Sequence, residues 1–373
     1  MEKNLNKEWM LNKTKNNINQ SLYTSIFTSG GIGEFYLSRE LKLTSAVSCE
    51  IVPQRAKWYK ELYPQTEMVC GDITDPVVFE QLVQLHLDKG CCGLLASPVC
   101  RDFTLANTKR NPNSKRAHLY ERVIEFARRT SPVWIVIENS DQMLKVRVGG
   151  KIVALKIVDA LKDLGYQVNY GIQDAANFLT PQHRRRTIIL AHKYKEPKLP
   201  EANGNIITLR EAISNLPVIE CGMKSNVALH DASLFRWSPA QIAVMAHTPS
   251  GASAHDNPDP WKAVKVDGSP SKAHFKCSFQ RRDWDDACNA ILQDSKSISG
   301  FRTCHPGNFV GVDADGMPMY DSCRPLTILE LLRVTGLPDD YPLPKWASDN
   351  LIRQMLGECW APKHELACLA QIV

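Results

Sequence analysis

Short apolar segments of strand length alternate with segments of helical periodicity along the first half of the chain, and this alternation limits the folds available to it. The segments that predict strands lie at about 25–27, 44–52, 68–70, 92–96, 133–137 and 187–191. The segments that predict helices are 34–42, 55–63, 79–87, 119–129 and 152–164. The pattern predicts an α/β fold with helices on both faces of a parallel sheet. Ligands of such sheets bind at the carboxyl ends of the strands, so the residues that follow each strand are the candidates for chemistry.

The composition of the sequence changes at about residue 193, where Pro, Gly, Ser, His and Asn become frequent and the alternation fades. Prolines interrupt regular elements through this region. We therefore predict a flexible arm at 1–20, a ligand-binding domain at 21–192 and a smaller loop-rich domain at 193–323. Helices are expected again within 324–373, where they would pack back on the first domain.

Composition argues against a membrane protein and against a structural metal site. No run of about 18 apolar residues occurs, so no membrane-spanning helix is expected. The polar N-terminus lacks the features of a signal peptide, which predicts a cytoplasmic protein with reduced thiols. The twelve cysteines are irregularly placed and form no CxxC pair. The net charge of +5 permits nucleic-acid binding without requiring it.

A glycine-rich turn at 29–33 follows the first predicted strand, and acidic residues follow the next two. Glycine lets the backbone approach a ligand closely, although the turn is not a GxGxxG fingerprint and taken alone is equally well a tight turn. Glu50 can accept hydrogen bonds from ribose hydroxyls, and Asp72 can accept one from an adenine amino group. Each acid by itself is equally a helix cap or a surface charge. Together, the turn and the two acids favour a ligand that contains adenosine.

Cys100 follows an apolar strand and begins a basic loop. A thiol at a strand end in a basic setting can have a low pKa and act as a nucleophile. The loop carries several cations at 101–116 against the single acid Asp102, which suits a polyanionic substrate. The alternatives are an incidental cysteine in a turn and a loop that is merely solvated.

Glu138 and an arginine run end two further strand regions. A carboxyl at the end of a buried strand can hold a proton for a ring nitrogen, or it can simply cap the next turn. Arg184 and Arg186 alternate within 182–186, so they would share one face and could clamp a phosphate or a base oxygen. A solvated basic edge is the alternative for the arginine run.

Taken in order, these segments resemble the motifs of the DNA cytosine-5 methyltransferase family, over about 25–190 and 324–373. Segment 98–104 is similar to the family's Pro-Pro-Cys-Gln-x-Phe-Ser motif, 138–140 to Glu-Asn-Val, and 182–186 to Gln-x-Arg-x-Arg. The other matching segments are 27–34, 49–50, 71–73, 324–341 and 357–362. No single motif is decisive, but seven or eight in the right order are highly specific.

The resemblance implies a Rossmann-like domain that uses S-adenosylmethionine, together with a smaller target-recognition domain at 193–323. It implies that Cys100 adds to carbon 6 of a flipped cytosine while Glu138 contacts ring N3. Arg184 would hold the base oxygen O2, and Arg186 would support that geometry. The residues implied for the cofactor are Phe27, Thr28, Gly31, Ile32, Gly33, Glu50, Ile51, Asp72, Ile73, Pro98, Glu358 and Cys359.

The implied partner is double-stranded DNA, bound by a monomer, with a separately encoded restriction endonuclease as a candidate second partner. The residues implied for DNA contact are Arg101, Thr104, Lys109, Arg110, Lys115, Arg116, Gln182, Arg281 and Arg282. For the last two the alternative is that 279–291 forms the core of its domain.

Several positions depart from the family pattern and keep two other functions open. Val99 replaces a proline, Arg101 replaces a glutamine, and Glu358 replaces an asparagine. These departures are compatible with a DNA-binding relative that has lost catalysis. An RNA cytosine methyltransferase on the same fold is the other alternative, although the long region between the eighth and ninth motifs favours DNA.

Overall fold

The computed structural model describes residues 19–99, 111, 114–272 and 277–373. The predicted arm therefore lies almost wholly outside the described residues, as does 100–110. The chain divides into two compact units, which we describe separately. Unit 1 runs to Asp174 and adds Arg185–Ala202 and Pro362–Val373, while unit 2 consists of Ala175–Arg184 and Asn203–Ala361.

Unit 1 is built on a seven-stranded sheet with the order β3-β2-β1-β4-β5-β10-β8. Its strands are β1 (Asn19–Ile26), β2 (Thr44–Glu50), β3 (Glu67–Cys70), β4 (Cys91–Ala96), β5 (Trp134–Ser140), β8 (Gln167–Asp174) and β10 (Arg185–His192). The first five strands pair in parallel. The strand order reverses between β1 and β4, so a ligand-binding crevice is expected at their carboxyl ends.

The expectation of a wholly parallel sheet was wrong at one edge. β10 runs antiparallel to both β5 and β8, and β8 was not predicted. The half-buried sequence of β8 mixes polar and apolar residues and contains a glycine, so it lacks the continuous apolar run of a central strand. Its antiparallel partner follows after only a short excursion, 175–184, so no crossover helix is required.

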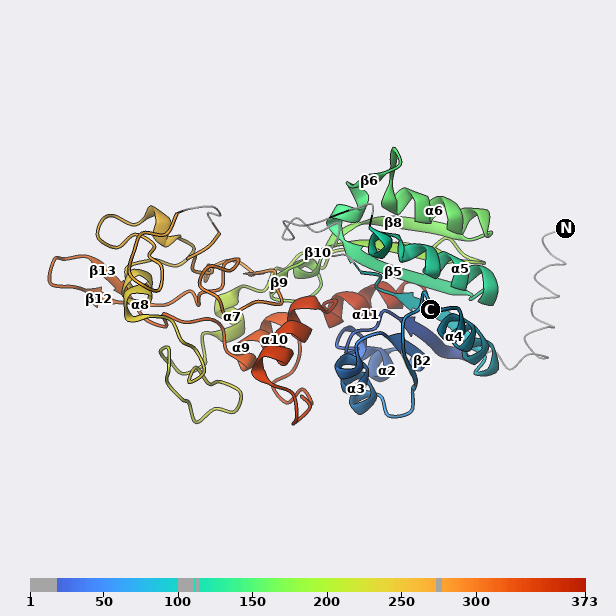
Figure 1. Ribbon diagram of the computed structural model, residues 1–373, viewed down its shortest axis with the longest axis horizontal. Helices are drawn as coiled ribbons and strands as arrows, with labels where there is room; N and C mark the ends of the chain where they lie inside the picture. The colour runs from blue at the N-terminus through green and yellow to red at the C-terminus, as the bar shows by residue number, and fades with distance from the viewer. Residues whose placement is uncertain (1–18, 100–110, 112–113, 273–276) are drawn as a thin grey trace. The chain divides into compact units, whose positions relative to one another are not determined.

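Helices cover both faces of this sheet (Figure 1). One face forms the main core with α4 (Pro76–Asp88), α5 (Tyr120–Thr130) and α6 (Val153–Asp163). On the other face lie α3 (Pro53–Leu62), the short turns η1 (Gly33–Tyr36) and α2 (Leu37–Glu40), and α11 (Pro362–Ala370). Short elements complete the unit: η2 (Lys115–His118), η3 (Asp141–Leu144), β6 (Arg147–Val148) and β7 (Lys151–Ile152).

Side-chain alternation separates the two faces of the sheet. Ile26, Ile135 and Ile137 point into the main core. Tyr23 and Trp134, whose positions alternate with these, meet on the opposite face with ring centroids 5.9 Å apart. By the same alternation Glu138 belongs to this opposite face, the one that α11 covers.

Unit 2 contains few regular elements, as the proline-rich sequence predicts. Its helices are α7 (Leu209–Ile213), α8 (Pro239–Ala246), α9 (Ile328–Thr335) and α10 (Asp349–Glu358), with the turns η4 (Ala175–Asn177) and η5 (Ala254–Asp256). Two short ladders join β9 (Gln182–His183) to β11 (Cys288–Asn289) and β12 (Phe309–Val312) to β13 (Pro318–Tyr320). The predicted C-terminal segment 324–373 is divided, because only Pro362–Val373 belongs to unit 1.

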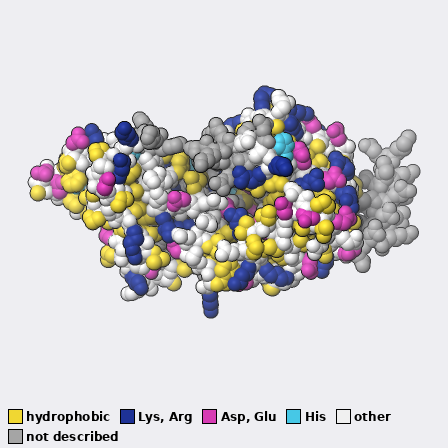
Figure 2. Space-filling view, viewed as in Figure 1, with side chains coloured by type: hydrophobic (Ala, Val, Ile, Leu, Met, Phe, Trp, Pro, Cys, Tyr) yellow, Lys and Arg dark blue, Asp and Glu magenta, His cyan; other side chains and the backbone are white. Residues whose placement is uncertain are grey.

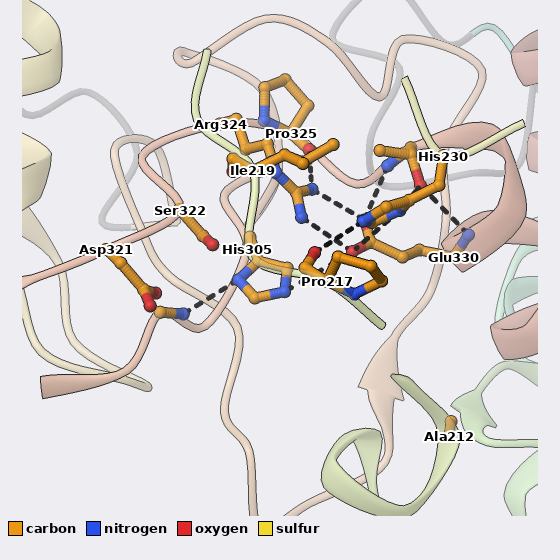
Figure 3. A network of polar contacts seen from close by, with 12 residues as sticks. Ala212, Pro217, Ile219, His230, His305, Asp321, Ser322, Arg324, Pro325 and Glu330 are labelled. Carbon is orange, nitrogen blue, oxygen red and sulfur yellow. Dashed lines mark hydrogen bonds and ion pairs between the residues drawn. The ribbon is translucent and has the colours of Figure 1, made fainter. Parts of the chain in front are cut away.

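A buried ion pair organises the centre of unit 2 (Figure 3). Arg324 donates from both terminal nitrogens to the carboxylate of Glu330, at 2.8 Å each. Glu330 also accepts from the backbone N–H of Thr327, the N-cap residue of α9, and lies 3.6 Å from the His305 ring. Burial alone would raise the pKa of Glu330, but the charge of Arg324 lowers it well below its ordinary value. The loops of unit 2 are therefore held by a matched pair of buried charges.

We predict that Glu330→Gln destabilises the protein by about 3–5 kcal/mol, because it leaves the Arg324 guanidinium buried without a counter-charge. Urea unfolding at neutral pH measures the loss. Asp285→Asn is the control, because its exposed carboxylate pairs with Arg210 at the surface and its removal should leave the midpoint almost unchanged. Equal shifts for the two variants would contradict a structural role for the buried pair.

The ion pair between Arg324 and Glu330 also predicts that the stability of the protein depends on pH. Because the folded pKa of Glu330 is lowered, its contribution is present at neutral pH and is lost as the pH falls below the unfolded value of about 4.3. The urea midpoint of the wild type should fall with acidification through this range. The urea midpoint of Glu330→Gln should fall less over the same pH interval, since this variant has no carboxylate to protonate at position 330.

Candidate active site

The glycine turn at the carboxyl end of β1 has the close backbone geometry that its sequence predicts. Gly31 has φ +69°, and a Cβ atom there would lie 2.6 Å from the ring of Tyr59. Tyr63, the residue that follows α3, donates from its hydroxyl to the Gly31 carbonyl at 2.8 Å. The neighbouring residues Phe27 and Ser29 also adopt positive φ. Two tyrosines thus hold the turn in a shape that only glycine allows at position 31.

Glu50 ends β2 beside this turn. One of its carboxylate oxygens accepts from the Ser29 N–H and the other from the Val52 N–H, both at 2.9 Å. The side chain therefore braces the glycine turn. Each carboxylate oxygen has a second acceptor position, which is compatible with the predicted ribose contact.

The ends of β2 and β3 supply an apolar surface and a carboxylate. Ile51 is 57% exposed, which is unusual for an isoleucine and leaves its side chain available to an adenine ring. Asp72 is exposed, and one of its oxygens accepts from the N–H and the hydroxyl of Thr74, both at 2.8 Å. Ile73 and Ile32 are buried beside these positions. The carboxylates of Glu50 and Asp72 and the exposed side chain of Ile51 together fit an adenosine-containing cofactor.

Glu138 at the end of β5 forms an ion pair with Arg186 of β10, with 2.5 Å between the nearest atoms. The antiparallel register places Arg186 opposite Ser140 and Ile188 opposite Glu138, so the two charged side chains lie on the same face. Both side chains are largely buried, at 10% and 16% exposed. The arrangement offers a carboxyl and a guanidinium side by side at the carboxyl edge of the sheet.

Asn139 connects this edge to the segment that carries the predicted nucleophile. Its side-chain amide donates to the carbonyl of Pro98 at 2.6 Å, and its carbonyl oxygen accepts from the Ser140 N–H. Pro98 is itself buried, two residues before Cys100. The predicted residues Cys100, Arg101, Thr104, Lys109 and Arg110 lie outside the described residues.

Two of the predicted DNA contacts, Lys115 and Arg116, lie exposed on η2. Lys115 also lines a surface cavity of about 410 Å³ with Thr74, His118 and Arg122. Figure 2 shows basic and acidic side chains interspersed on the visible face of unit 1. Exposed cations of this kind remain candidates for phosphate contact.

The structure corrects the interpretation of Gln182 and Arg184. Gln182 is buried, donates to the carbonyl of Val334 and accepts from the N–H of Ile291, each at 3.2 Å. Arg184 is 3% exposed and donates to the carbonyls of Ile291 and Gly357, both at 3.0 Å. These side chains join segments of unit 2, and Arg184 and Arg186 do not share an environment. Of the two arginines, Arg186 is the one that accompanies Glu138.

Arg281 and Arg282 were expected at the DNA face and are instead buried, at 0% and 2% exposed. The Arg281 guanidinium donates to the carbonyls of Met245, His305 and Asp321. Arg282 donates to the carbonyl of Asn289 at 2.8 Å. The alternative interpretation of this region, a domain core, is therefore correct. The physical reason is that backbone carbonyls with no partner strand need hydrogen-bond donors from elsewhere. A guanidinium group supplies five N–H donors.

The end of α10 carries two predicted cofactor residues within unit 2. Glu358 accepts from the Gln293 side chain at 2.6 Å, and Cys359 is nearly buried. A Cβ atom at Gly357 would lie 2.4 Å from the backbone of Leu292, so the glycine is required by close packing. The cofactor contacts of Glu358 and Cys359 remain predictions.

Two buried carboxyls of unit 1 were not among the predicted site residues. Glu34 in η1 accepts from the hydroxyls of Tyr23, Ser25 and Tyr59 at 2.7–2.8 Å. Glu365 in α11 is 3% exposed. A signal was present for Glu365, because it occupies an apolar position of the helical period that also contains Leu369.

Within the described ranges, no helix is long and apolar enough to cross a membrane. No group of three or more His, Cys, Asp or Glu side chains in the same residues is arranged to hold a metal ion.

Comparisons with known proteins agree with the family resemblance that the motifs indicate. A family model described as C-5 cytosine-specific DNA methylase matches residues 24–372. The chain is 34% identical to the type II methyltransferase M1.HgaI of Avibacterium volantium, over 91% of this chain and 94% of the relative. It is 22% identical to the type II methyltransferase M1.HphI of Haemophilus parahaemolyticus, over 79% and 72%.

Solved structures share the fold. The Entamoeba histolytica methyltransferase EhMeth superimposes with a TM-score of 0.61 at 14% identity, over 95% of this chain and 98% of that chain. The S. pombe Dnmt2 methyltransferase gives a TM-score of 0.59 at 14% identity, over 95% and 98%.

We predict that Arg281→Met lowers the urea midpoint of the protein, while the salt dependence of its affinity for duplex DNA stays as in the wild type. The buried guanidinium stabilises loop carbonyls and reaches no phosphate. Lys115→Met is the comparison, since a lost phosphate contact reduces the slope of log K against log salt by about 1. A reduced slope for Arg281→Met, measured where it is fully folded, would restore the original DNA-contact assignment.

Proposed function

The chain belongs to the C-5 cytosine-specific DNA methylase family, and on that basis we propose that it methylates carbon 5 of cytosine in duplex DNA through a covalent bond between Cys100 and carbon 6. The observation that carries this proposal is the position of the Glu138–Arg186 pair at the sheet edge. The neighbouring Asn139 holds Pro98, just before the nucleophile. One strand end thus supplies both a pyrimidine-binding carboxyl and an anchor for the Cys100 segment.

The proposed chemistry begins with a base flipped out of the duplex, because carbon 6 is inaccessible within the stack. The Cys100 thiolate adds to carbon 6, and Glu138 contacts ring N3 and favours its protonation, so that carbon 5 becomes enamine-like. Arg186 takes the O2 contact that was first assigned to Arg184, since Arg186 lies beside Glu138. After methylation of carbon 5, loss of its proton and elimination of the Cys100 thiolate restore the aromatic ring.

The proposed cofactor is S-adenosylmethionine, which when bound supplies an electrophilic methyl group. The glycine turn at 29–33 would admit close approach, Glu50 would hold the ribose, and Ile51 would pack on the adenine. Asp72 would accept from the adenine amino group. This assignment rests on the fit of the exposed isoleucine and the two strand-end acids to an adenosine.

The proposed substrate is double-stranded DNA, bound by a monomer through the loop at 101–116 and through the region 193–323. The loop and η2 carry cations for phosphates, with Lys115 and Arg116 exposed. The relatives named above are type II methyltransferases, and we propose a separately encoded restriction endonuclease as the functional partner.

Covalent trapping tests the proposal. Wild-type protein should form a stable adduct with duplex DNA that contains 5-fluorocytosine at its target, because fluorine at carbon 5 cannot leave as a proton does. Cys100→Ala should give no adduct and at least a thousandfold lower methylation, as expected when a covalent nucleophile is removed. Cys277→Ser, which alters a half-buried thiol of unit 2, should behave as the wild type.

Three results would reject the assignment. Methylation at the normal rate by Cys100→Ala would exclude the nucleophile. Methyl incorporation into tRNA alone, in a parallel assay with the wild type, would favour the RNA alternative. Tight DNA binding by the wild type without any adduct would favour a relative that has lost catalysis.

A further inference from the structure

Glu365 is a buried carboxyl for which the proposed function has no use so far. It lies on α11, on the face of the sheet that carries Glu138, and is 3% exposed. Its Oε1 atom is fully buried and has no hydrogen-bond partner among the described residues. Leaving a carboxyl oxygen buried without a partner costs free energy, so such a group in a native fold calls for an explanation.

The neighbours of α11 place it over the reacting edge of the sheet. His364 forms a hydrogen bond with Oε1 of Gln173 at 3.1 Å, and the Cys368 thiol lies 3.6 Å from the same oxygen. Gln173 pairs in register with Arg186, the partner of Glu138. The helix α11 also packs against η1, the turn that contains Glu34. Glu365 therefore belongs to a helix that spans from the cofactor turn to the pyrimidine-binding carboxyl.

The charges around Glu365 are unbalanced. Glu34 accepts from three hydroxyls, those of Tyr23, Tyr59 and Ser25, although burial still raises its pKa, and Glu138 pairs with Arg186. Both carboxyls act on Glu365 with the same sign of charge.

Both the burial of Glu365 and its charged neighbours favour the neutral acid. Burial, and then the charges of Glu34 and Glu138, raise the pKa of Glu365 well above its ordinary value. His364 offers no compensating charge, because burial and then Arg186 lower its pKa to about 3. In the protein without ligand the neutral acid is therefore the favoured form of Glu365, in a place where a cation would be favoured.

We propose that Glu365 is the counter-charge for the sulfonium centre of the methyl donor, giving up its proton to solvent when that cation binds. The inference rests on the proposed function. A sulfonium near a buried carboxyl favours the carboxylate, because the attraction of opposite charges is strong where water is excluded. S-Adenosylhomocysteine has a neutral thioether in place of the sulfonium, so it leaves Glu365 protonated. Glu365 would then favour binding of the donor over binding of the spent cofactor.

Isothermal titration of the full-length protein, without DNA, tests the inference. Titrations at one pH in two buffers of different ionisation enthalpy count the protons released per ligand bound. We expect the wild type to release up to one proton on binding S-adenosylmethionine and none on binding S-adenosylhomocysteine. Glu365→Gln should abolish the release and lower the preference for the charged ligand about tenfold, the equivalent of one pKa unit. Its affinity for S-adenosylhomocysteine should change little.

Two further variants keep the result interpretable. Glu365→Asp retains the carboxyl and should retain the proton release even if packing weakens both ligands. Cys368→Ser alters the same face of α11 one turn away and should leave both the proton count and the preference unchanged. If Glu365→Gln weakens both ligands equally, or the wild type releases no proton, the counter-charge role is rejected while the proposed function stands. If the wild type binds neither ligand, the proposed function fails with it.

Discussion

A charge removed from water must be matched by an opposite charge or by hydrogen bonds, and both units of this protein depend on that requirement. In unit 1 the antiparallel pairing of β10 with β5 places Arg186 beside Glu138, so a carboxyl can be kept at the buried end of a strand. In unit 2 the guanidinium groups of Arg281 and Arg324 supply donors and charge to loops that have few ladders of their own. Arginine thus performs two tasks here, one at the candidate active site and one in place of regular secondary structure.

The central strands and their helices were predictable because their signals are local. A continuous apolar run such as 92–96 favours a buried strand, and the helical period of 152–164 indicates which face of that helix is buried. Strand direction at the sheet edge is not local information. β8 is half-buried and mixed in polarity, and the antiparallel course of β10 follows from where the excursion 175–184 returns. Neither property leaves a periodic signature in the residues themselves.

The same distinction applies to the site. The positions of Glu50, Asp72 and Glu138 at or just after strand ends were predictable because the strand pattern is local, and the fold class places such ends at a ligand-binding edge. Arginine outside that scheme was not predictable. The sequence around Arg281 does not indicate whether its guanidinium binds a phosphate or backbone carbonyls, because both are hydrogen-bond acceptors. In the structure it donates to the carbonyls of Met245, His305 and Asp321. Burial decides between them, and burial in a loop-rich unit depends on contacts distant in sequence.

Charge matching also relates the reaction to the architecture of unit 1. The proposed chemistry brings a cationic methyl donor and a pyrimidine to the edge of the sheet where Glu138, Arg186 and the glycine turn lie. Arg186 already matches Glu138, and the hydroxyls of Tyr23 and Tyr59 already satisfy Glu34. A third carboxyl, Glu365, has a buried oxygen without a hydrogen-bond partner among the described residues. A protonated acid there avoids a buried negative charge while no cation is bound and becomes a counter-ion when one arrives, so the site need not hold an uncompensated charge in either state.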